Sequence, residues 1–213
     1  MSGRLVAWLS LVGALVALAY GARAASGKPD QDVLYHYSTA VSGIVQYALI
    51  GLVVLAIAHG ADRLLAVRLP RRPGAALGAA LAVLVATYVV GALVDLYSNP
   101  GKEQGLTPSR WEPAHAGAFA ANFVVVAGVA PIVEELLFRG LGYSLLERHS
   151  RWLAILGVGI AFGLVHGLIA GFPVLAFFGA ALAWLRSRTD SVLPGIGVHA
   201  AFNAIALVVA VTT

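Results

Sequence analysis

The chain has 213 residues, of which 60% are hydrophobic and only 11% are charged, with a net charge of +4 and no cysteine. Soluble domains carry roughly 25% charged residues, so this composition indicates an integral membrane protein and excludes an ordinary soluble domain. The lack of cysteine excludes disulfides, thiolate metal sites and cysteine nucleophiles, and no basic surface interleaved with aromatic residues suggests a nucleic acid partner.

Seven apolar runs follow one another along the chain, and a membrane helix needs roughly 20 such residues. The runs are Leu5–Tyr20, Val41–His59, Ala75–Leu96, Ala116–Val133 with the charged stretch after it, Trp152–Ile169, Phe172–Leu185 and Val192–Val211. The sequence therefore predicts an all-α, polytopic membrane helix bundle with about seven transmembrane helices. The sixth run is short, so it either crosses with little tilt or extends through Ala170 and Gly171.

The first run allows two interpretations. Arg4, the apolar stretch and the triplet Ala22-Arg23-Ala24 resemble a secretory signal with its cleavage site. We expect this segment to stay as the first transmembrane helix, because polytopic proteins usually keep one, but cleavage is the open alternative. Both interpretations place Ala25 outside the cytoplasm.

Basic residues predict the orientation. With a cytoplasmic N-terminus, the outer loops carry only Arg23, Lys28, Lys102 and Arg110, and the inner ends of the helices carry nine arginines. This imbalance favours an extracytoplasmic C-terminus and suits a bacterial inner membrane protein. The run from Arg68 to Arg72 belongs to the inner face, where it can contact anionic lipid.

The stretch Pro131–Gly140 contains three charged side chains inside a long apolar run. One charge at the bilayer centre costs about 2.5–3.5 kcal/mol, so these groups must face the protein interior and find partners. Glu135 and Arg139 are four residues apart and share a helix face, so they can pair. Glu134 is rotated by about 100° from Glu135 and cannot use the same arginine equally well. One glutamate is therefore held by a cation, and the other is left for another task.

Three further polar residues lie inside the C-terminal runs, namely His166, His199 and Asn203. At about 1.5 Å of rise per residue, Glu134, His166 and Asn203 each lie ~20–22 Å from the inner end of their helix, and His199 lies one turn shallower. Three helices thus bring polar groups to one level, which is nearer the outer face in the predicted topology.

A carboxylate, two imidazoles and an amide at one level can activate water. A buried glutamate can serve as general base, a neutral histidine can orient the water, and amide and imidazole N–H groups can stabilise an oxyanion. The same atoms could instead hold zinc. However, the sequence has no H-E-x-x-H motif and its histidines lie on different helices, so no local spacing supports zinc.

Three spaced motifs resemble those of a known family. They are E-E-x-x-x-R at Glu134, Glu135 and Arg139, F-x-x-x-H at Phe162 and His166, and H-x-x-x-N at His199 and Asn203. In this order they resemble the CPBP family of CAAX proteases and bacteriocin-processing enzymes, also called the Abi family. The resemblance covers residues 116–211, and no motif position departs from the pattern. It divides the chain into the first helix or signal-like segment (1–24), N-terminal helices and outer loops (25–115) and CPBP-like catalytic helices (116–213).

The resemblance implies a CAAX-protease-like bundle and a glutamate-dependent intramembrane endopeptidase. Glu134 would activate water with help from His166, and His199 and Asn203 would form the oxyanion hole. By the same resemblance Glu135, Arg139 and Phe162 would be structural or would position substrate, and no metal or other cofactor is expected, with a zinc metalloprotease as the alternative. The implied partners are the lipid bilayer and a membrane-anchored protein or peptide: a prenylated C-terminal peptide, a bacteriocin precursor or a C-terminal sorting signal. The predicted depth favours the sorting signal.

Other interpretations remain open for the same residues. The two glutamates could form a structural ion-pair network, His166 and Phe162 could pack, and Asn203 could link two helices. A proton- or ion-coupled transporter would also use buried carboxylates, although the repeated halves typical of such proteins are not visible. A third alternative is a non-catalytic membrane scaffold. Gly159, Gly163 and Gly167 recur every four residues and predict a packing seam.

Overall fold

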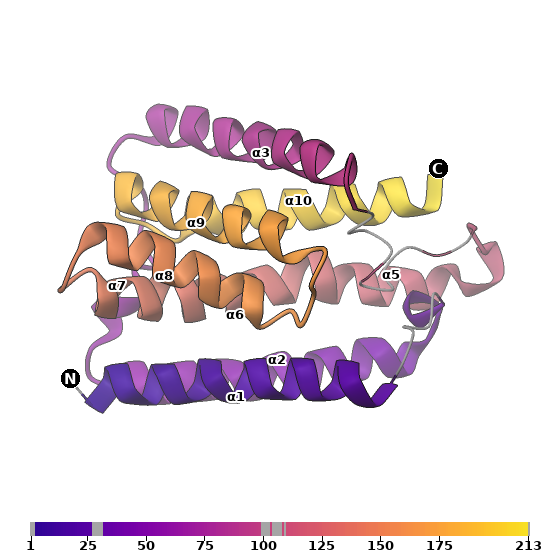
Figure 1. Cartoon of the computed structure of the whole chain (residues 1–213), viewed down its shortest axis with the longest axis horizontal. Coiled ribbons are helices and arrows are strands. Elements are labelled where there is room, and N and C mark those ends of the chain that lie inside the picture. Colours follow the sequence, from indigo (N-terminus) through magenta and orange to yellow (C-terminus); the bar gives the residue numbers. More distant parts are fainter. Residues whose placement is uncertain (1–2, 27–31, 99–102, 104–107, 109, 213) are drawn as a thin grey trace.

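The computed structural model describes residues 3–26, 32–98, 103, 108 and 110–212. Within these residues all regular elements are helical and no strand occurs. The main helices run along one common direction, and the two termini lie at opposite ends of the bundle (Figure 1). The predicted all-α helix bundle is confirmed.

All seven apolar runs form helices. The fourth run is one continuous helical stretch, in which π-helical turns at Val125–Val129 and Leu136–Gly142 separate three α-helical pieces. These pieces are α5 (Ala116–Val124), α6 (Ala130–Glu135) and α7 (Tyr143–Leu146). The other helices are α1 (Gly3–Ser26), α2 (Tyr37–Ala58), α3 (Pro73–Asp95), α8 (Arg151–Leu164), α9 (Phe172–Thr189) and α10 (Leu193–Thr212).

Five of these helical stretches in the described residues are long and apolar enough to cross a membrane, namely α1, α2, α3, the α5–α7 stretch and α10. Helix α8 is a shorter apolar helix by the same measure, and the count of about seven crossings stays a prediction. Helix α8 ends at Leu164, short of the predicted Ile169, because the chain turns at Gly167, whose φ is +65°. Gly171 caps the start of α9, so the sixth run does not extend through it.

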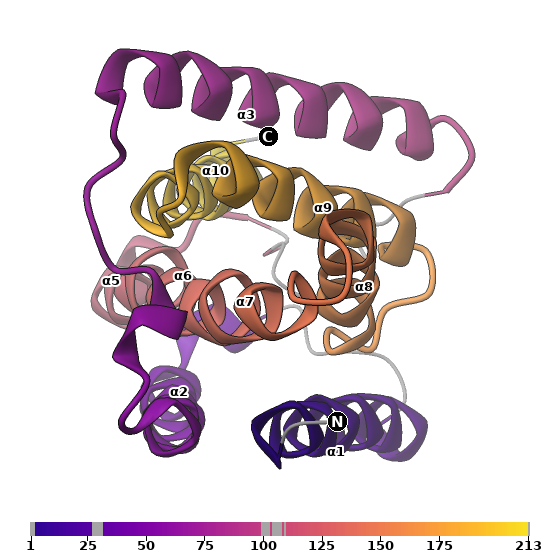
Figure 2. The ribbon, with the colours of Figure 1, turned by 90° about the vertical axis from the view of Figure 1, so that its left-hand side faces the viewer.

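The helices are arranged in layers around the α5–α7 stretch. Seen along the bundle, α6 and α7 lie in the middle, α1 and α2 lie on one side, and α9 and α10 lie on the other (Figure 2). Helix α3 lies at the periphery, where it packs on α9 and α10. The stretch with the charged motif is thus surrounded by other helices, which is the environment that its charges require.

Part of the predicted glycine seam joins α8 to α9. A Cβ atom on Gly159 would lie 2.7 Å from the Cβ atom of Ala180 and 2.8 Å from the carbonyl oxygen of Ala176. A Cβ on Gly163 would lie 3.1 Å from the backbone nitrogen of Ala176. The seam is confirmed at these two positions. The prediction was wrong for Gly167, which lies in the turn after α8 and faces α1 instead.

Helix α1 is anchored by hydrogen bonds at its N-terminal half. The indole N–H of Trp8 donates to the carbonyl oxygen of Leu137 at 3.0 Å, deep in the core. Gly142 makes room for this indole, since a Cβ there would lie 2.5 Å from the ring. Arg4 donates to the carbonyl oxygens of Ile57 and His59 at the end of α2. Retention of α1 in the mature protein stays a prediction, and its removal would break all of these contacts.

The C-terminal end of α1 is held by Glu103. This carboxylate pairs with Arg23 at 2.8 Å and accepts the backbone N–H groups of Ile169 and Gly171. Burial raises the pKa of Glu103, but the two N–H groups and Arg23 outweigh that effect and lower the pKa below its ordinary value. The charged form of Glu103 thus ties α1 to the turn between α8 and α9.

The glycine seam generates a stability prediction. Gly159→Ala should lower the free energy of unfolding by about 1–3 kcal/mol, because the new methyl group meets the backbone of α9 and the two helices must separate. The matched control is Gly157→Ala on the same helix, where the Cβ would lie 3.4 Å from the end of the Leu146 side chain. Thermal unfolding in detergent measures both. Equal stability of the two variants would contradict the seam.

Candidate active site

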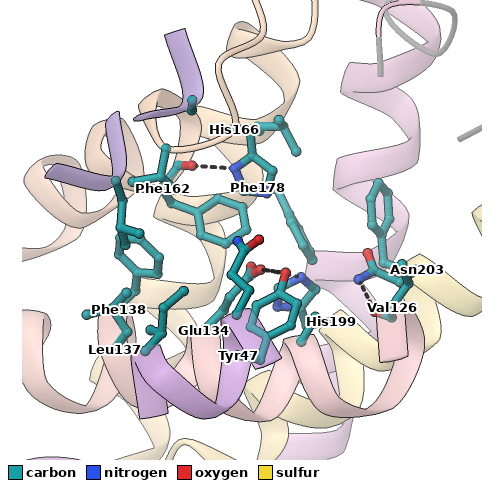
Figure 3. A pocket seen from close by; sticks show the side chains of 18 of the residues that line it. Tyr47, Val126, Glu134, Leu137, Phe138, Phe162, His166, Phe178, His199 and Asn203 are labelled. Carbon is teal, nitrogen blue, oxygen red and sulfur yellow. Dashed lines mark hydrogen bonds and ion pairs between the residues drawn. The ribbon is translucent and has the colours of Figure 1, made fainter. Parts of the chain in front are cut away.

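A cavity of about 640 Å³ lies between α1, α2, the α5–α7 stretch and α8–α10. The four predicted catalytic residues, Glu134, His166, His199 and Asn203, all line it (Figure 3). Most of the other lining side chains are apolar, including several phenylalanines. The structure therefore brings the three motifs together at one concave site, which is the usual setting for a binding or catalytic site.

A fully buried ion pair lies beside the cavity without lining it. The guanidinium of Arg139 lies 2.9 Å from Oε1 of Glu135, and neither side chain is exposed. Arg139 also donates to the carbonyl oxygen of Gly179 on α9 at 3.1 Å. The predicted pairing of Glu135 with Arg139 is confirmed. Two charges removed from water in this way are stable only as a pair.

The same carboxylate orients His199. Nδ1 of His199 lies 3.2 Å from Oε1 of Glu135, and a carboxylate oxygen can only accept, so Nδ1 carries a proton. The other ring nitrogen, Nε2, lies 3.8 Å from Oε2 of Glu134. Glu135 thus fixes both the position of the imidazole and the nitrogen that it presents to Glu134.

Glu134 has a different set of neighbours. Its Oε1 accepts a hydrogen bond from the hydroxyl of Tyr47 at 2.7 Å (Figure 3). Its Oε2 accepts no hydrogen bond within the part of the chain that the structure describes. The side chain is 14% exposed, against 0% for Glu135. Only one of the two adjacent glutamates is committed to Arg139, as the helix geometry predicted.

Tyr47 was not predicted from the sequence as a site residue. It lies on α2, outside the segment that carries the three motifs, and lines the cavity beside Gln46. The available signal was the polar pair Gln46-Tyr47 in an otherwise apolar run. Such a pair at membrane depth needs a partner, which here is Glu134 for the phenol.

The sequence predicted that His166 lies within a helix. In the structure it lies on the turn after α8. Its Nδ1 lies 2.6 Å from the carbonyl oxygen of Phe162. A carbonyl can only accept, so Nδ1 is the donor and Nε2 of the neutral ring is left as an acceptor. The depth of His166 was estimated from the helical rise per residue. That rise applies only up to Leu164, where α8 ends.

Asn203 binds to a carbonyl group that the α5–α7 stretch leaves free. In the π-helical turn, the N–H of Ala130 bonds to the carbonyl of Val125 and not to that of Val126. Pro131, the next residue, has no N–H to offer. The side-chain amide of Asn203 takes this place and donates to Val126 at 2.8 Å. One amide hydrogen therefore links α10 to the central helix, and the other is available to the cavity.

Phe162 packs beneath the charged groups. It is buried, with its ring centroid 4.4 Å from the guanidinium carbon of Arg139 and 5.6 Å from the ring of His199. Edge-on contacts to Phe138 and Phe178 complete the cluster. A cation over an aromatic face is attracted to it, so Phe162 helps to hold Arg139 as well as filling space.

The arrangement can activate a water molecule. A carboxylate oxygen of Glu134, Nε2 atoms from two histidines and an amide group border one cavity with apolar walls. Low polarity around such groups strengthens their interactions with a reacting molecule. Among the described residues, no group of three histidine, aspartate or glutamate side chains is placed to hold a metal ion.

Comparison with known families agrees with the motifs. Residues 116–205 match the family model described as type II CAAX prenyl endopeptidase Rce1-like. This region is an Rce1-like domain. It is consistent with the CPBP family and includes every residue of the three motifs, whereas Tyr47 lies outside it. The Rce1-like family implies a membrane protease with membrane-protein substrates. No curated protein and no solved structure matched the chain.

The unequal surroundings of the two glutamates predict unequal effects on stability. Glu135→Gln should lower the free energy of unfolding by about 3–5 kcal/mol, because Arg139 would stay buried without a counter-charge. Glu134→Gln should change stability little, since an amide can still accept from Tyr47. Chemical or thermal unfolding in detergent measures both variants. A larger loss for Glu134→Gln would show that the roles are reversed.

Proposed function

We propose that the protein is an intramembrane endopeptidase that hydrolyses a peptide bond of a membrane-associated protein or peptide with water activated by Glu134. The observation that carries this proposal is the separation of the two glutamates. Glu135 is paired with Arg139, whereas Glu134 reaches the cavity with one carboxylate oxygen that accepts no hydrogen bond from the described residues. A buried carboxylate inside a membrane protein that is not used for pairing is a candidate for chemistry.

In the proposed reaction, Glu134 takes a proton from water as the water oxygen attacks the carbonyl carbon of the scissile bond. Nε2 of His166 accepts the second water hydrogen and so orients the nucleophile. The free amide hydrogen of Asn203 stabilises the tetrahedral oxyanion, together with the Nε2–H of a doubly protonated His199 whose Nδ1–H stays on Glu135. Glu134 then gives its proton to the leaving amine nitrogen, and the C–N bond breaks.

These steps use only side chains of this chain, and we propose a glutamic-type mechanism without metal. In this mechanism Nδ1 of each histidine is held by an oxygen of the protein and the other ring nitrogen faces the reaction, an arrangement that would also suit a metal ligand. Zinc metalloprotease chemistry is the competing proposal. Chelation would abolish cleavage by a zinc enzyme and leave the glutamic mechanism intact.

The substrate proposed for this site is a membrane-anchored bacterial protein or peptide. The cavity is lined by Leu18 of α1 and Gln46 of α2, and Leu18 is 70% exposed. We propose that an apolar segment in the bilayer enters the cavity from the side, between these two helices. Among the substrate classes of the family, a C-terminal sorting signal fits this route and the predicted outward position of the site.

The first test is cleavage itself. Protein reconstituted in liposomes should cleave a membrane-anchored substrate, and Glu134→Gln should reduce the rate by at least about 1,000-fold while the protein stays folded, because the base is lost. The assay measures product formation, and thermal unfolding verifies folding. Full activity in Glu134→Gln would reject the mechanism. Proton or ion flux in place of any cleavage would favour the transporter alternative.

Tyr47 is proposed to position Glu134. Tyr47→Phe removes one hydrogen bond to a charged group, worth about 1.5–3 kcal/mol, so kcat should fall by about 10–100-fold. KM should change little, because the phenol acts on the base and not on the substrate. Tyr37→Phe on the same helix is the matched control, since Tyr37 is 62% exposed. A rise in KM with unchanged kcat would assign Tyr47 to substrate binding.

The predicted orientation can be tested with single cysteines, because the chain has none of its own. Ala170→Cys and Val211→Cys should react with an impermeant thiol reagent added outside cells. Arg71→Cys should react only after the membrane is opened, since it belongs to the predicted inner face. The opposite labelling pattern would invert the orientation and would favour a cytoplasmic prenylated substrate.

A further inference from the structure

A second cleft of about 590 Å³ lies between the start of α3 and the end of α9. It shares no lining residue with the active-site cavity. Arginines contribute much of its wall, with Arg71 and Arg72 from the segment before α3 and Arg188 from the last turn of α9. Trp184 lies one turn before Arg188 on the same helix and also lines the cleft. The cleft is therefore a separate site with a strongly basic lining.

The positive charge in this cleft is not neutralised by the protein. Asp190 is the one carboxylate among the lining residues, and it is already paired with Arg68 at 2.6 Å and with Arg186 at 2.9 Å. Burial raises the pKa of Asp190, but hydrogen bonds and charges from these two arginines lower it overall. Within the described residues, the three arginines that line the cleft form no ion pair and no side-chain hydrogen bond.

The start of α3 adds further donors. The first intrahelical bond of this helix joins the N–H of Ala76 to the carbonyl oxygen of Arg72, so the N–H groups of Gly74 and Ala75 have no partner within the helix. Unpaired N–H groups and the helix dipole favour an anion at this end. Guanidinium groups from the segment before α3 and from α9 border one cleft together with the backbone of Ala75, and a phosphate oxygen is an acceptor that suits both kinds of donor.

The surroundings favour a lipid phosphate over a free one. Ala75 and Ala79 line the cleft, and Val89 and Leu93, which are 54% and 55% exposed, follow on the same face of α3. Trp184 has the amphipathic ring that is enriched at the boundary between headgroups and hydrocarbon. A phospholipid whose phosphate lies among the arginines can lay its acyl chains along this apolar face of α3. We propose that this cleft binds the headgroup of an anionic phospholipid.

General attraction between inner-face arginines and anionic lipid is the competing explanation, and the chain offers a matched control. Arg63 and Arg148 belong to the same end of the bundle in the predicted topology, and the structure gives neither an ion pair with a described residue. They do not line the cleft. The double variants Arg72→Gln/Arg188→Gln and Arg63→Gln/Arg148→Gln therefore remove equal charge, but only the first removes charge from the cleft.

The test is a thermal unfolding titration of full-length protein in detergent. Phosphatidylglycerol should raise the Tm saturably, whereas phosphatidylcholine and inorganic phosphate at the same concentrations should not. In the cleft variant, the phosphatidylglycerol concentration for half the effect should rise by about 10–30-fold, given about 1 kcal/mol per arginine near anionic lipid. The control variant should behave as the wild type.

Three results would overturn the proposal. Equal weakening in both double variants would show general surface attraction, and an equal shift with inorganic phosphate would assign the cleft to a free anion. If phosphatidylglycerol does not raise the Tm of the wild-type protein saturably, the cleft does not bind this lipid. Unfolding without lipid serves as the folding check for each variant. If the double cleft variant is unstable, the single variant Arg188→Gln is used instead, and native mass spectrometry measures how much phosphatidylglycerol it binds. An occupancy equal to that of the wild type would contradict the proposal.

Discussion

The buried ion pair of Glu135 and Arg139 is the interaction on which the site depends. Both side chains are fully buried, so neither could stay charged without the other. Their remaining contacts tie separate helices together, since Arg139 bonds to Gly179 on α9 and Glu135 holds His199 on α10. A pair that is needed for folding also fixes an imidazole of the proposed oxyanion hole. Because Arg139 is used in this way, the adjacent Glu134 keeps an oxygen for the cavity.

The π-helical turns on either side of α6 have a comparable role. A π-helical turn changes which backbone groups pair, and such turns are often found at functional sites. At Val126 the shifted bonding and the following Pro131 leave a carbonyl that Asn203 binds. In the second turn, the Leu137 carbonyl accepts from Trp8 and so anchors α1. The irregular backbone of the central helix thus provides attachment points for α1 and α10, and both helices line the same cavity.

Much of the fold could be predicted because hydrophobic runs report burial in lipid directly. The pairing of Glu135 with Arg139 followed from helical spacing, and the Rce1-like domain followed from three spaced motifs. The π-helical turns could not be predicted, because inserting one residue into a turn hardly changes the apolar pattern of a membrane helix. Tyr47 was missed because its contact joins residues 87 positions apart. The end of α8 was misplaced because Gly167 turns the chain within an apolar run.

The most direct measurement of the central claim is a pair of double-mutant cycles on stability, one for Glu135 with Arg139 and one for Glu134 with Arg139. The account predicts a coupling free energy of about 3 kcal/mol or more for the first pair, because removing either partner strands a buried charge. For the second pair a clearly smaller coupling is expected, since among the described residues Arg139 forms its ion pair with Glu135, and Glu134 acts on it only through its charge at longer range. Equal coupling in the two cycles would contradict the account, because both glutamates would then share the cation.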